Sequence, residues 1–362
     1  MKIALVHDSL VEFGGAERFL QGLLAVFPNA HVYTAFSDDR TVRGFFPDLS
    51  PLRLHSSWTQ GTLLMRHISL FQCVSPLVWS KFNLEKYDLV ISSSAYVFSN
   101  LIHVKRPVHI QYIHSLPKNV FGLEPPSPLQ RISTYAGLLR FLYIRALRST
   151  PYILTNSKHT HDTLLRICGI ESTVIYPPVH IPSRIPKKQK GKYFLCVTRI
   201  DKTKGLELPV IACSQLGLPL KLVGVAYDLS YEQYLRSLAG PTVDFLGFLP
   251  DKEIWKLYAS AQAFIFPSQN EDFGIAPVEA MAYGVPVIAY QGGGALETVV
   301  EGKTGIFFRE YTSEALARVL TTFDVKNIRA SDLLEHVKRF SRQRFMKELK
   351  KFVVLIGNKT MV

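Results

Sequence analysis

Two acidic residues separated by seven positions are the part of this chain best suited to chemistry. Glu271 and Glu279 stand in the segment EDFGIAPVEAMAYGVPVI, which follows an apolar run at 263–266. That run predicts a strand buried on both faces. Open α/β sheets bind ligands at the carboxyl ends of their strands, so both acids should lie at that edge beside the backbone amides of Phe273–Ile275. Two carboxylates and a row of amides suit a polyol that carries a leaving group.

Pro277 is typical of the first residue of a helix, which would put Glu279 in the first helical turn. The unpaired N–H groups of a first turn favour negative charge there. An isolated pair of acids at this spacing is most often two surface residues of an ordinary strand–loop–helix unit. The fuller pattern here, with Phe-Gly between the acids and Glu-Ala-Met-Ala-x-Gly-x-Pro-Val-Ile after them, favours a functional interpretation.

Basic groups that could neutralise a departing phosphate also follow a predicted strand. Arg199 ends the run at 193–198, and Lys204 stands five positions later, just before Gly205. An Arg and a Lys in a loop are more often solvated. Gly14-Gly15 follows the first predicted strand and opens a helix, as phosphate-binding loops do, although most such pairs mark a tight turn.

Apolar runs alternate with helical patterns along the whole chain, which predicts parallel sheets with crossover helices. A segment rich in Pro and Lys at 179–191 lacks periodicity and is predicted to link two domains. We expect an α/β fold of two doubly wound, Rossmann-like domains, at 1–178 and 192–340, facing an interdomain cleft. A last helix within 341–362 either crosses back to the first domain or caps the second core. The predicted strands are 2–7, 31–35, 89–93, 109–114, 152–156, 193–198, 219–224, 243–247, 263–266 and 285–289.

Composition narrows the class of protein. A chain of 362 residues with 47% hydrophobic residues can bury two cores. The net charge of +13 points to an acidic partner, but no nucleic-acid-binding motif is present, so nucleic acid is not expected. The four cysteines form no C-x-x-C pair and are interpreted as reduced core residues. The polar N-terminus does not resemble a signal peptide, and no apolar run reaches the ~20 residues needed to span a bilayer, which predicts a cytoplasmic protein.

In its full form the segment from Glu271 to Ile288 resembles the donor-binding signature of family 4 of the retaining, nucleotide-sugar-dependent glycosyltransferases. The resemblance covers nearly the whole chain and implies the GT-B fold. It implies that Arg199 and Lys204 bind the diphosphate of the donor. It further implies that Glu271 and the Phe273–Ile275 amides hold the sugar, and that Glu279 binds the ribose.

The resemblance extends to the first domain. Gly14-Gly15 resembles the family loop whose backbone approaches the diphosphate and the acceptor, and His114 resembles the His of the family's Tyr-x-His motif near the transferred sugar. Gly292-Gly-Gly294 is either a plain turn or, as in the family, a loop beside the nucleotide. Relatives that transfer mannose often follow the His with Ser/Thr-Pro-x-Arg, whereas this chain has Ser-Leu-Pro-Lys118. The departure leaves the acceptor less defined than the donor.

Basic residues are interleaved with apolar ones in two stretches, which suits an anionic membrane surface or, equally, a core helix. The stretch around 138–147 contains Arg140 and Arg145, and the stretch from Trp58 to Phe82 contains Arg66, His67 and Lys81. We expect Lys118, Arg140 and Arg145 to face the acceptor or the membrane. This predicts a peripheral protein at the inner face of the plasma membrane.

The resemblance is strongest to mannosyltransferases of bacterial surface-polysaccharide assembly, through Val174-Ile-Tyr-Pro-Pro178 and Gly292–Val300. We expect a retaining hexosyltransferase that moves mannose from GDP-mannose to a lipid- or polyprenyl-diphosphate-linked glycan, with no metal and no further cofactor. A UDP-sugar-dependent enzyme of the same fold and an inactive scaffold of an assembly complex are the alternatives. An epimerase or phosphorylase fits the signature less well, and a nicotinamide oxidoreductase is disfavoured because no G-x-G-x-x-G follows the first strand.

Overall fold

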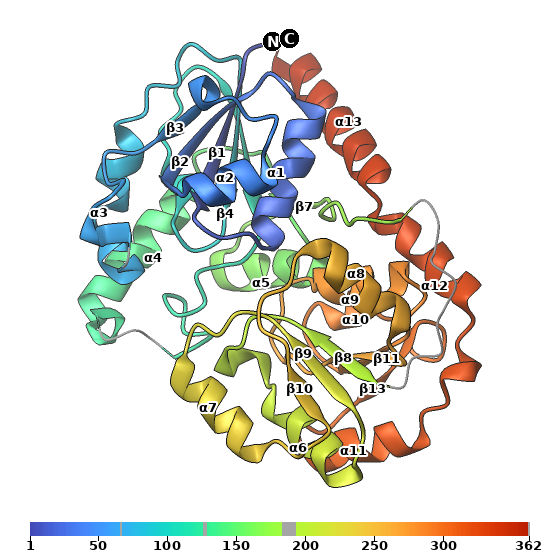
Figure 1. Cartoon of the computed structure of the whole chain (residues 1–362). Coiled ribbons are helices and arrows are strands. Elements are labelled where there is room, and N and C mark those ends of the chain that lie inside the picture. The colour runs from blue at the N-terminus through green and yellow to red at the C-terminus, as the bar shows by residue number, and fades with distance from the viewer. Residues whose placement is uncertain (66, 126–128, 183–192, 361–362) are drawn as a thin grey trace. The chain divides into compact units, whose positions relative to one another are not determined.

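The computed structural model describes residues 1–65, 67–125, 129–182 and 193–360 (Figure 1). They form two compact units, one of Met1–Pro178 with Phe345–Val362 and the other of Val179–Arg344. Most of the predicted linker at 179–191 lies outside the described residues, as does Arg66. Each unit is described by itself below.

The first unit is built on a seven-stranded parallel sheet with strand order β3-β2-β1-β4-β5-β6-β7. Its strands are β1 (Ile3–Leu10), β2 (His31–Ser37), β3 (Leu54–Ser56), β4 (Leu89–Ser94), β5 (Val108–Ile113), β6 (Ile153–Thr155) and β7 (Thr173–Val174). Its helices are α1 (Gly15–Val26), α2 (Asp39–Phe45), α3 (Ile68–Ser80), α4 (Ser133–Leu147), α5 (Lys158–Cys168) and most of α13 (Arg342–Thr360).

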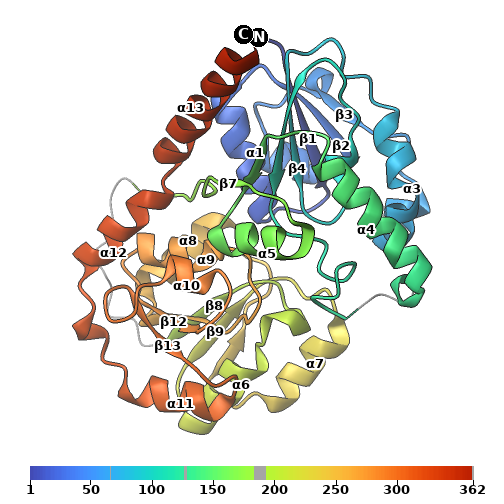
Figure 2. The ribbon, with the colours of Figure 1, turned by 180° about the vertical axis from the view of Figure 1, so that it is seen from behind.

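Helix α1 follows β1 and packs against α13, the last helix of the chain. Its apolar stripe, which includes Phe19 and Leu23, is buried in one core with Phe345 and Leu349 of α13. Phe345 packs edge-to-face against Phe19, with ring centroids 5.4 Å apart, and both views show α1 and α13 side by side (Figure 2). A Cβ at Gly22 would lie 2.5 Å from Cγ of Pro178 and 3.1 Å from the Phe345 ring. The close approach of these helices therefore depends on glycine there.

The second unit is built on a six-stranded parallel sheet with strand order β10-β9-β8-β11-β12-β13. Its strands are β8 (Phe194–Val197), β9 (Leu220–Val223), β10 (Val243–Phe245), β11 (Ala263–Phe266), β12 (Val287–Tyr290) and β13 (Gly305–Phe308). Its helices are α6 (Glu207–Leu216), α7 (Leu229–Leu238), α8 (Asp251–Ser260), α9 (Ile275–Ala282), α10 (Ala295–Thr298), α11 (Ser313–Thr322) and α12 (Ala330–Val337).

The two sheets confirm the predicted α/β class, since each is parallel and doubly wound. In each sheet the direction of winding reverses at one place, between β1 and β4 in the first unit and between β8 and β11 in the second. Ligands of such sheets bind at the carboxyl ends of the strands beside this switch point. The loops after β1, β4, β8 and β11 are therefore the places to look for function.

Two details depart from the sequence-based expectation, the number of strands and the place of Cys73. Strands β3, β7 and β13 were not predicted. Cys73 is exposed on α3 and donates a hydrogen bond to Tyr135 Oη at 3.1 Å, so it is not a core residue, whereas Cys168, Cys196 and Cys213 are buried. In the described part of the chain, no helix combines the length and apolarity that crossing a bilayer requires.

Candidate functional site

An ion pair at the switch point of the second unit joins two of the predicted site residues. Lys204 Nζ donates a hydrogen bond to Glu271 Oε2 at 2.7 Å, and the Ser268 hydroxyl donates to the same oxygen at 3.2 Å. The Lys204 side chain is 13% exposed and that of Glu271 is 27% exposed. Since β8 and β11 are adjacent, the loops that follow them bring these residues together from 67 positions apart. A mostly buried charge pair responds more strongly to a bound anion than a solvated pair does.

A short helical turn holds Lys204 in place. The turn Lys202–Lys204 is capped by the carboxylate of Asp201, which accepts the amide and the hydroxyl of Thr203 at 2.8 and 2.6 Å. Burial raises the pKa of Asp201, but these hydrogen bonds and the charges of Arg199 and Lys204 outweigh burial, so the net pKa is lowered. Asp201 thus stays ionised and keeps the loop fixed.

Gly205 ends this turn at φ +63°, where a Cβ would lie 2.0 Å from the hydroxyl of Tyr311. Only glycine fits this position without moving Tyr311. Arg199 lies at the start of the same loop, and its guanidinium carbon is 5.5 Å from the centroid of the Tyr227 ring. Arg199 and Lys204 therefore belong to one loop with defined packing, as the sequence predicted for its position after β8.

Helix α9 begins earlier than predicted. Its N-cap is Gly274, which has φ +85°, and its first residue is Ile275, so Pro277 is the third residue of the helix. Glu279 is the fifth residue rather than a member of the first turn, and the interpretation based on Pro277 is wrong. Glu279 is 7% exposed and accepts a long hydrogen bond of 3.4 Å from Tyr258 Oη. The left-handed backbone at Gly274 turns the chain into the helix two residues sooner than proline alone suggests.

The loop Gly292–Gly294 packs directly on the loop that carries Glu271. The amide of Gly294 donates to the carbonyl oxygen of Glu271 at 2.7 Å. A Cβ at Gly293 would lie 2.6 Å from that carbonyl oxygen, and a Cβ at Gly294 would lie 2.6 Å from Cα of Phe273. These contacts are with backbone atoms, which cannot swing aside. Gly293 and Gly294 are therefore required by close packing, which fixes the backbone on which Glu271 and Phe273 stand.

In the first unit, His114 is held at the carboxyl end of β5. Its amide donates to the carbonyl of Ser94 at 2.9 Å, and its carbonyl accepts from Asn156 Nδ2 at 2.8 Å. Its ring packs edge-on against Phe19 and Tyr112, with centroids 5.0 and 4.9 Å away. Burial, and to a smaller extent the neighbouring His7, lowers the pKa of His114 to about 3. His114 is therefore a neutral imidazole at physiological pH.

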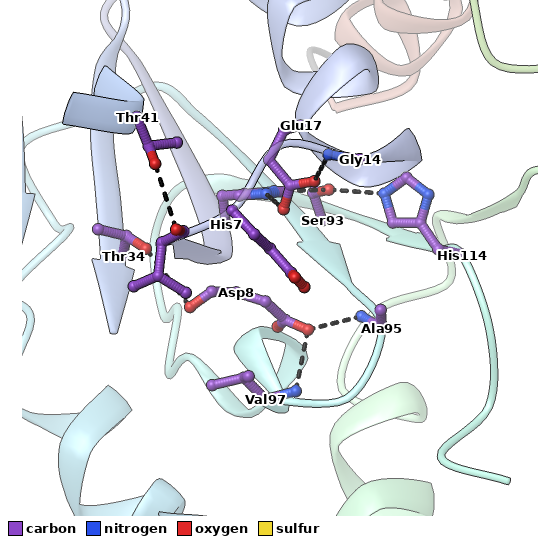
Figure 3. Close-up of polar contacts among 12 residues, drawn as sticks. His7, Asp8, Gly14, Glu17, Thr34, Thr41, Ser93, Ala95, Val97 and His114 are labelled. Carbon is purple, nitrogen blue, oxygen red and sulfur yellow. Dashed lines mark hydrogen bonds and ion pairs between the residues drawn. The ribbon is translucent and has the colours of Figure 1, made fainter. Parts of the chain in front are cut away.

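Sequence reasoning missed the polar groups around His114. Figure 3 shows His7 and Glu17 pointing toward Ser93, which hydrogen-bonds to the His114 ring. Ser93 Oγ lies 2.8 Å from His114 Nε2 and 3.1 Å from His7 Nδ1, and His7 Nε2 lies 3.4 Å from Glu17 Oε1. The signal was available, because polar residues interrupt the apolar pattern at the ends of β1 and β4, at His7-Asp8-Ser9 and Ser92-Ser-Ser94.

Asp8 binds the loop that follows β4. Its Oδ2 accepts the amides of Ala95, Tyr96 and Val97 at 2.8, 2.8 and 2.9 Å (Figure 3). Its Oδ1 accepts the amide of Ser99 at 2.9 Å. The carboxylate is 4% exposed, so four backbone donors satisfy a buried charge. This clamp fixes the backbone immediately after Ser93.

Gly14 is the N-cap of α1, and its amide donates to Glu17 Oε2 at 2.8 Å. The predicted phosphate loop at Gly14-Gly15 is therefore occupied at one amide by a carboxylate of the protein itself. Glu17 is 6% exposed and also reaches His7. The role of these two glycines at a diphosphate stays a prediction.

Of the predicted acceptor residues, two are on α4 and Lys118 is on the loop that follows His114. Arg140 and Arg145 are exposed on α4, and Arg140 Nε donates to the carbonyl of Val120. The carbonyl of Lys118 accepts the amides of Leu123 and Glu124 at 2.8 and 3.3 Å, which folds the loop after His114 into a compact turn. Arg140 therefore anchors this loop to α4.

The chain is similar to known proteins in sequence and in fold. Residues 180–344 match the family Glycosyl transferases group 1. The chain is 25% identical to the alpha-1,3/1,6-mannosyltransferase ALG2 of Kluyveromyces lactis over 83% of this chain and 71% of that protein. It is 28% identical to the O-antigen chain mannosyltransferase RfbU of Salmonella typhimurium over 45% of this chain and 47% of that protein.

The fold is also that of solved structures. The crystal structure of Anabaena Alr3699/HepE in complex with UDP and glucose matches with a TM-score of 0.74 at 22% identity, over 98% of this chain and 99% of that chain. The two parallel sheets, the group 1 match and the mannosyltransferase relatives lead to one assignment. Residues 180–344 form a group 1 glycosyltransferase domain, and the chain is a glycosyltransferase with the GT-B fold.

Proposed function

We propose that the chain transfers mannose from GDP-mannose to a lipid- or polyprenyl-diphosphate-linked glycan in surface-polysaccharide biosynthesis. The observation that best supports a donor site is the Lys204–Glu271 pair, which is mostly buried and lies at the switch point of a parallel sheet. The names of the relatives ALG2 and RfbU support mannose as the sugar. GDP-mannose and the membrane-linked acceptor follow from the resemblance to surface-polysaccharide enzymes.

The predicted site residues of the second unit have these roles in the proposal. Arg199 and Lys204 bind the diphosphate and stabilise the negative charge that grows as it leaves. Glu271 and the Phe273–Ile275 amides hold the hydroxyls of the sugar. Glu279 accepts hydrogen bonds from the ribose, and its present bond from Tyr258 is weak at 3.4 Å, so exchanging that bond for a ribose hydroxyl costs little.

The proposed reaction retains the anomeric configuration. The bond between C1 of the sugar and the diphosphate oxygen breaks, and the acceptor oxygen bonds to C1 from the same face. The acceptor proton passes to an oxygen of the departing phosphate, so no protein base is required. In the first unit His114 hydrogen-bonds to a hydroxyl of the transferred sugar, which suits its neutral ring.

Thermal-shift measurements with GDP, UDP, ADP and guanosine test the donor. A nucleotide at 100 times its dissociation constant stabilises the folded protein by ~2.7 kcal/mol, which a melting curve resolves. We expect GDP to raise the melting temperature most. Guanosine should raise it little, because it offers no diphosphate to Arg199 and Lys204. A response to UDP alone would overturn GDP-mannose, and no response to any diphosphate would overturn the donor site.

A surface on α3 and α4 supports the membrane-linked acceptor. Both views show these two helices close together in the first unit (Figure 2). Cys73 on α3 donates a hydrogen bond to the hydroxyl of Tyr135 on α4. The surface exposes large apolar side chains beside basic ones. Its exposed apolar members are Leu70, Leu77, Leu138 and Phe141 on the two helices and Trp58, Leu63 and Ile132 in the segments before them. Its exposed basic members are Arg140 and Arg145 on α4 and His67, Lys81, Arg131 and Arg148 next to the helix ends.

No Asp or Glu occurs in the sequence from 49 to 84 or from 125 to 161, the two segments that supply this surface. Basic side chains contribute ~1 kcal/mol each near an anionic leaflet, and exposed apolar side chains insert among the headgroups. We therefore propose peripheral binding at the inner face of the plasma membrane through α3 and α4. Leu138 and Phe141 are 54% and 59% exposed, and a helix that faces only water gains nothing from large apolar side chains at such positions.

Flotation with vesicles tests this surface. The chain should float with vesicles that contain phosphatidylglycerol and should remain at the bottom with pure phosphatidylcholine. Phe141→Glu should reduce flotation severalfold, because it places a negative charge on the binding face. Leu229→Glu, at a similarly exposed apolar residue on α7 of the second unit, is the matched control. Equal flotation of both variants would rule out α4 as the membrane contact.

A further inference from the structure

A buried chain of hydrogen bonds in the first unit links helix α1 to the ring of His114. It runs from Glu17 through His7 and Ser93 to His114, at 3.4, 3.1 and 2.8 Å (Figure 3). His7 is 0% exposed and Ser93 is 1% exposed, so water does not compete for these bonds. The other ring nitrogen of His114, Nδ1, has no hydrogen-bond partner among the residues that the structure describes.

The number of protons available to these four side chains limits the possible directions of their hydrogen bonds. The Ser93 hydroxyl has one proton, so it donates to one imidazole and accepts from the other. The Glu17 carboxylate only accepts, and it already receives the Gly14 amide, so His7 Nε2 must carry a proton. Two states remain, which differ in whether His7 Nδ1 accepts from Ser93 or donates to it.

The geometry favours a neutral His7. Charged imidazolium–carboxylate pairs are short, about 2.7–2.9 Å, whereas His7 Nε2 lies 3.4 Å from Glu17 Oε1. A neutral His7 with its proton on Nε2 must accept the Ser93 proton at Nδ1. The Ser93 oxygen then accepts a proton from His114 Nε2. The His114 ring therefore carries its proton on Nε2 and offers a lone pair at Nδ1.

We propose that Glu17, His7 and Ser93 are positioning residues that hold His114 as the Nε2–H tautomer, so that Nδ1 accepts a hydrogen bond from a hydroxyl of the bound sugar. The inference rests on the proposed role of His114 and adds the direction of its hydrogen bond. The sugar hydroxyl then points its proton at His114 and keeps its oxygen lone pairs for a donor elsewhere. The packing of Phe19 and Tyr112 fixes the ring position, and the hydrogen-bond chain fixes the tautomer.

Nitrogen NMR of the histidine side chains in the whole protein, without substrate, tests the tautomer directly. In the unmodified chain, His114 should show a protonated Nε2 and an unprotonated Nδ1. Ser93→Ala removes the only group shared by the two rings and should give a mixture of tautomers. The matched control is Ser92→Ala, because Ser92 makes a similar buried bond of 2.9 Å to His109 Nε2 on the same strands. The control should leave the His114 signals unchanged.

Kinetics give the second measurement. Ser93→Ala should lower kcat about tenfold with little change in KM for the donor, the scale of one misdirected hydrogen bond of ~1–1.5 kcal/mol. Glu17→Gln should act in the same direction, because an amide can also donate to His7 Nε2, and it serves if Ser93→Ala does not fold. A protonated Nδ1 on His114 in the unmodified chain would overturn the inference, as would unchanged tautomers in both variants. The NMR measurement needs no nucleotide. Failure of the donor assignment would therefore appear in the thermal-shift measurements, and failure of this inference would appear in the NMR spectra.

Discussion

Replacing Lys204 by Ala should lower the rate of sugar transfer by about 100-fold or more, the scale of losing one charge-stabilising group. Lys204 is mostly buried and lies 2.7 Å from Glu271. In the proposed reaction its ammonium stabilises the diphosphate as the C1–O bond breaks. The variant loses this positive charge and also removes the Lys204 ammonium from the Glu271 carboxylate, which adds repulsion toward the departing phosphate. Rates with saturating donor measure the effect.

Lys202→Ala is the matched control. Lys202 belongs to the same helical turn, but its side chain is 70% exposed and pairs with Asp228 at 3.7 Å on the surface. Exposed pairs contribute ~0–1 kcal/mol, so this variant should transfer sugar at a nearly normal rate. A comparable loss in both variants would mean that the turn has been disturbed, and near-normal activity of Lys204→Ala would refute the assignment.

The same pair predicts non-additive effects. Glu271→Ala should also lower transfer by about 100-fold or more, through loss of its bonds to the sugar. Because Lys204 and Glu271 are hydrogen-bonded to each other, the double variant should lose less than the product of the two single losses. Simple multiplication of the two losses would show that they act independently.

The sequence predicted the second unit's site better than the first unit's, for a physical reason. Lys204 and Glu271 each follow a strongly apolar strand, and such strands in a parallel sheet end at one edge, so their meeting could be inferred. The start of α9 could not, because it depends on the left-handed backbone at Gly274, whereas Pro277 fits both the first and the third helical position. Strand β3 has three residues, too few for a periodic signal.

The polar cluster around His114 could not be predicted from the sequence, for a different reason. His7 and Asp8 continue β1, which is buried throughout, and single polar residues in a strand do not show which neighbour they face. The partner of His7 is on β4, 86 residues later, and the partners of Asp8 are in the loop after β4, so only the strand order β1-β4-β5 brings them together. The prediction of His114 came from resemblance, whereas Glu17, His7 and Ser93 require the sheet to be assembled first.

Asp8→Asn should lower the free energy of unfolding of the first unit by about 4 kcal/mol. Hydrogen bonds to a charged group contribute ~1.5–3 kcal/mol each, and the side-chain amide turns one of two accepting oxygens into a donor that faces backbone N–H groups. The loop also contains Phe98 in the left-handed region at φ +62°, where a bulky side chain costs ~1–3 kcal/mol that the Asp8 hydrogen bonds must offset. Loss of the clamp therefore releases a strained loop.

Urea unfolding followed by the fluorescence of Trp79 reports on the part of the first unit that contains this loop. Trp79 is fully buried in the first unit and donates to the carbonyl of Val97 at 3.1 Å, so its emission follows the clamped segment. A Trp58→Phe, Trp255→Phe background leaves Trp79 as the one tryptophan of the three in the sequence. The matched control is Asp38→Asn, at the N-cap of α2, where the carboxylate accepts the amides of Arg40 and Thr41 and the Thr41 hydroxyl, and the expected loss is ~1 kcal/mol. If Asp8→Asn costs no more than Asp38→Asn, Asp8 is an ordinary cap and the loop is held by its packing against Trp79.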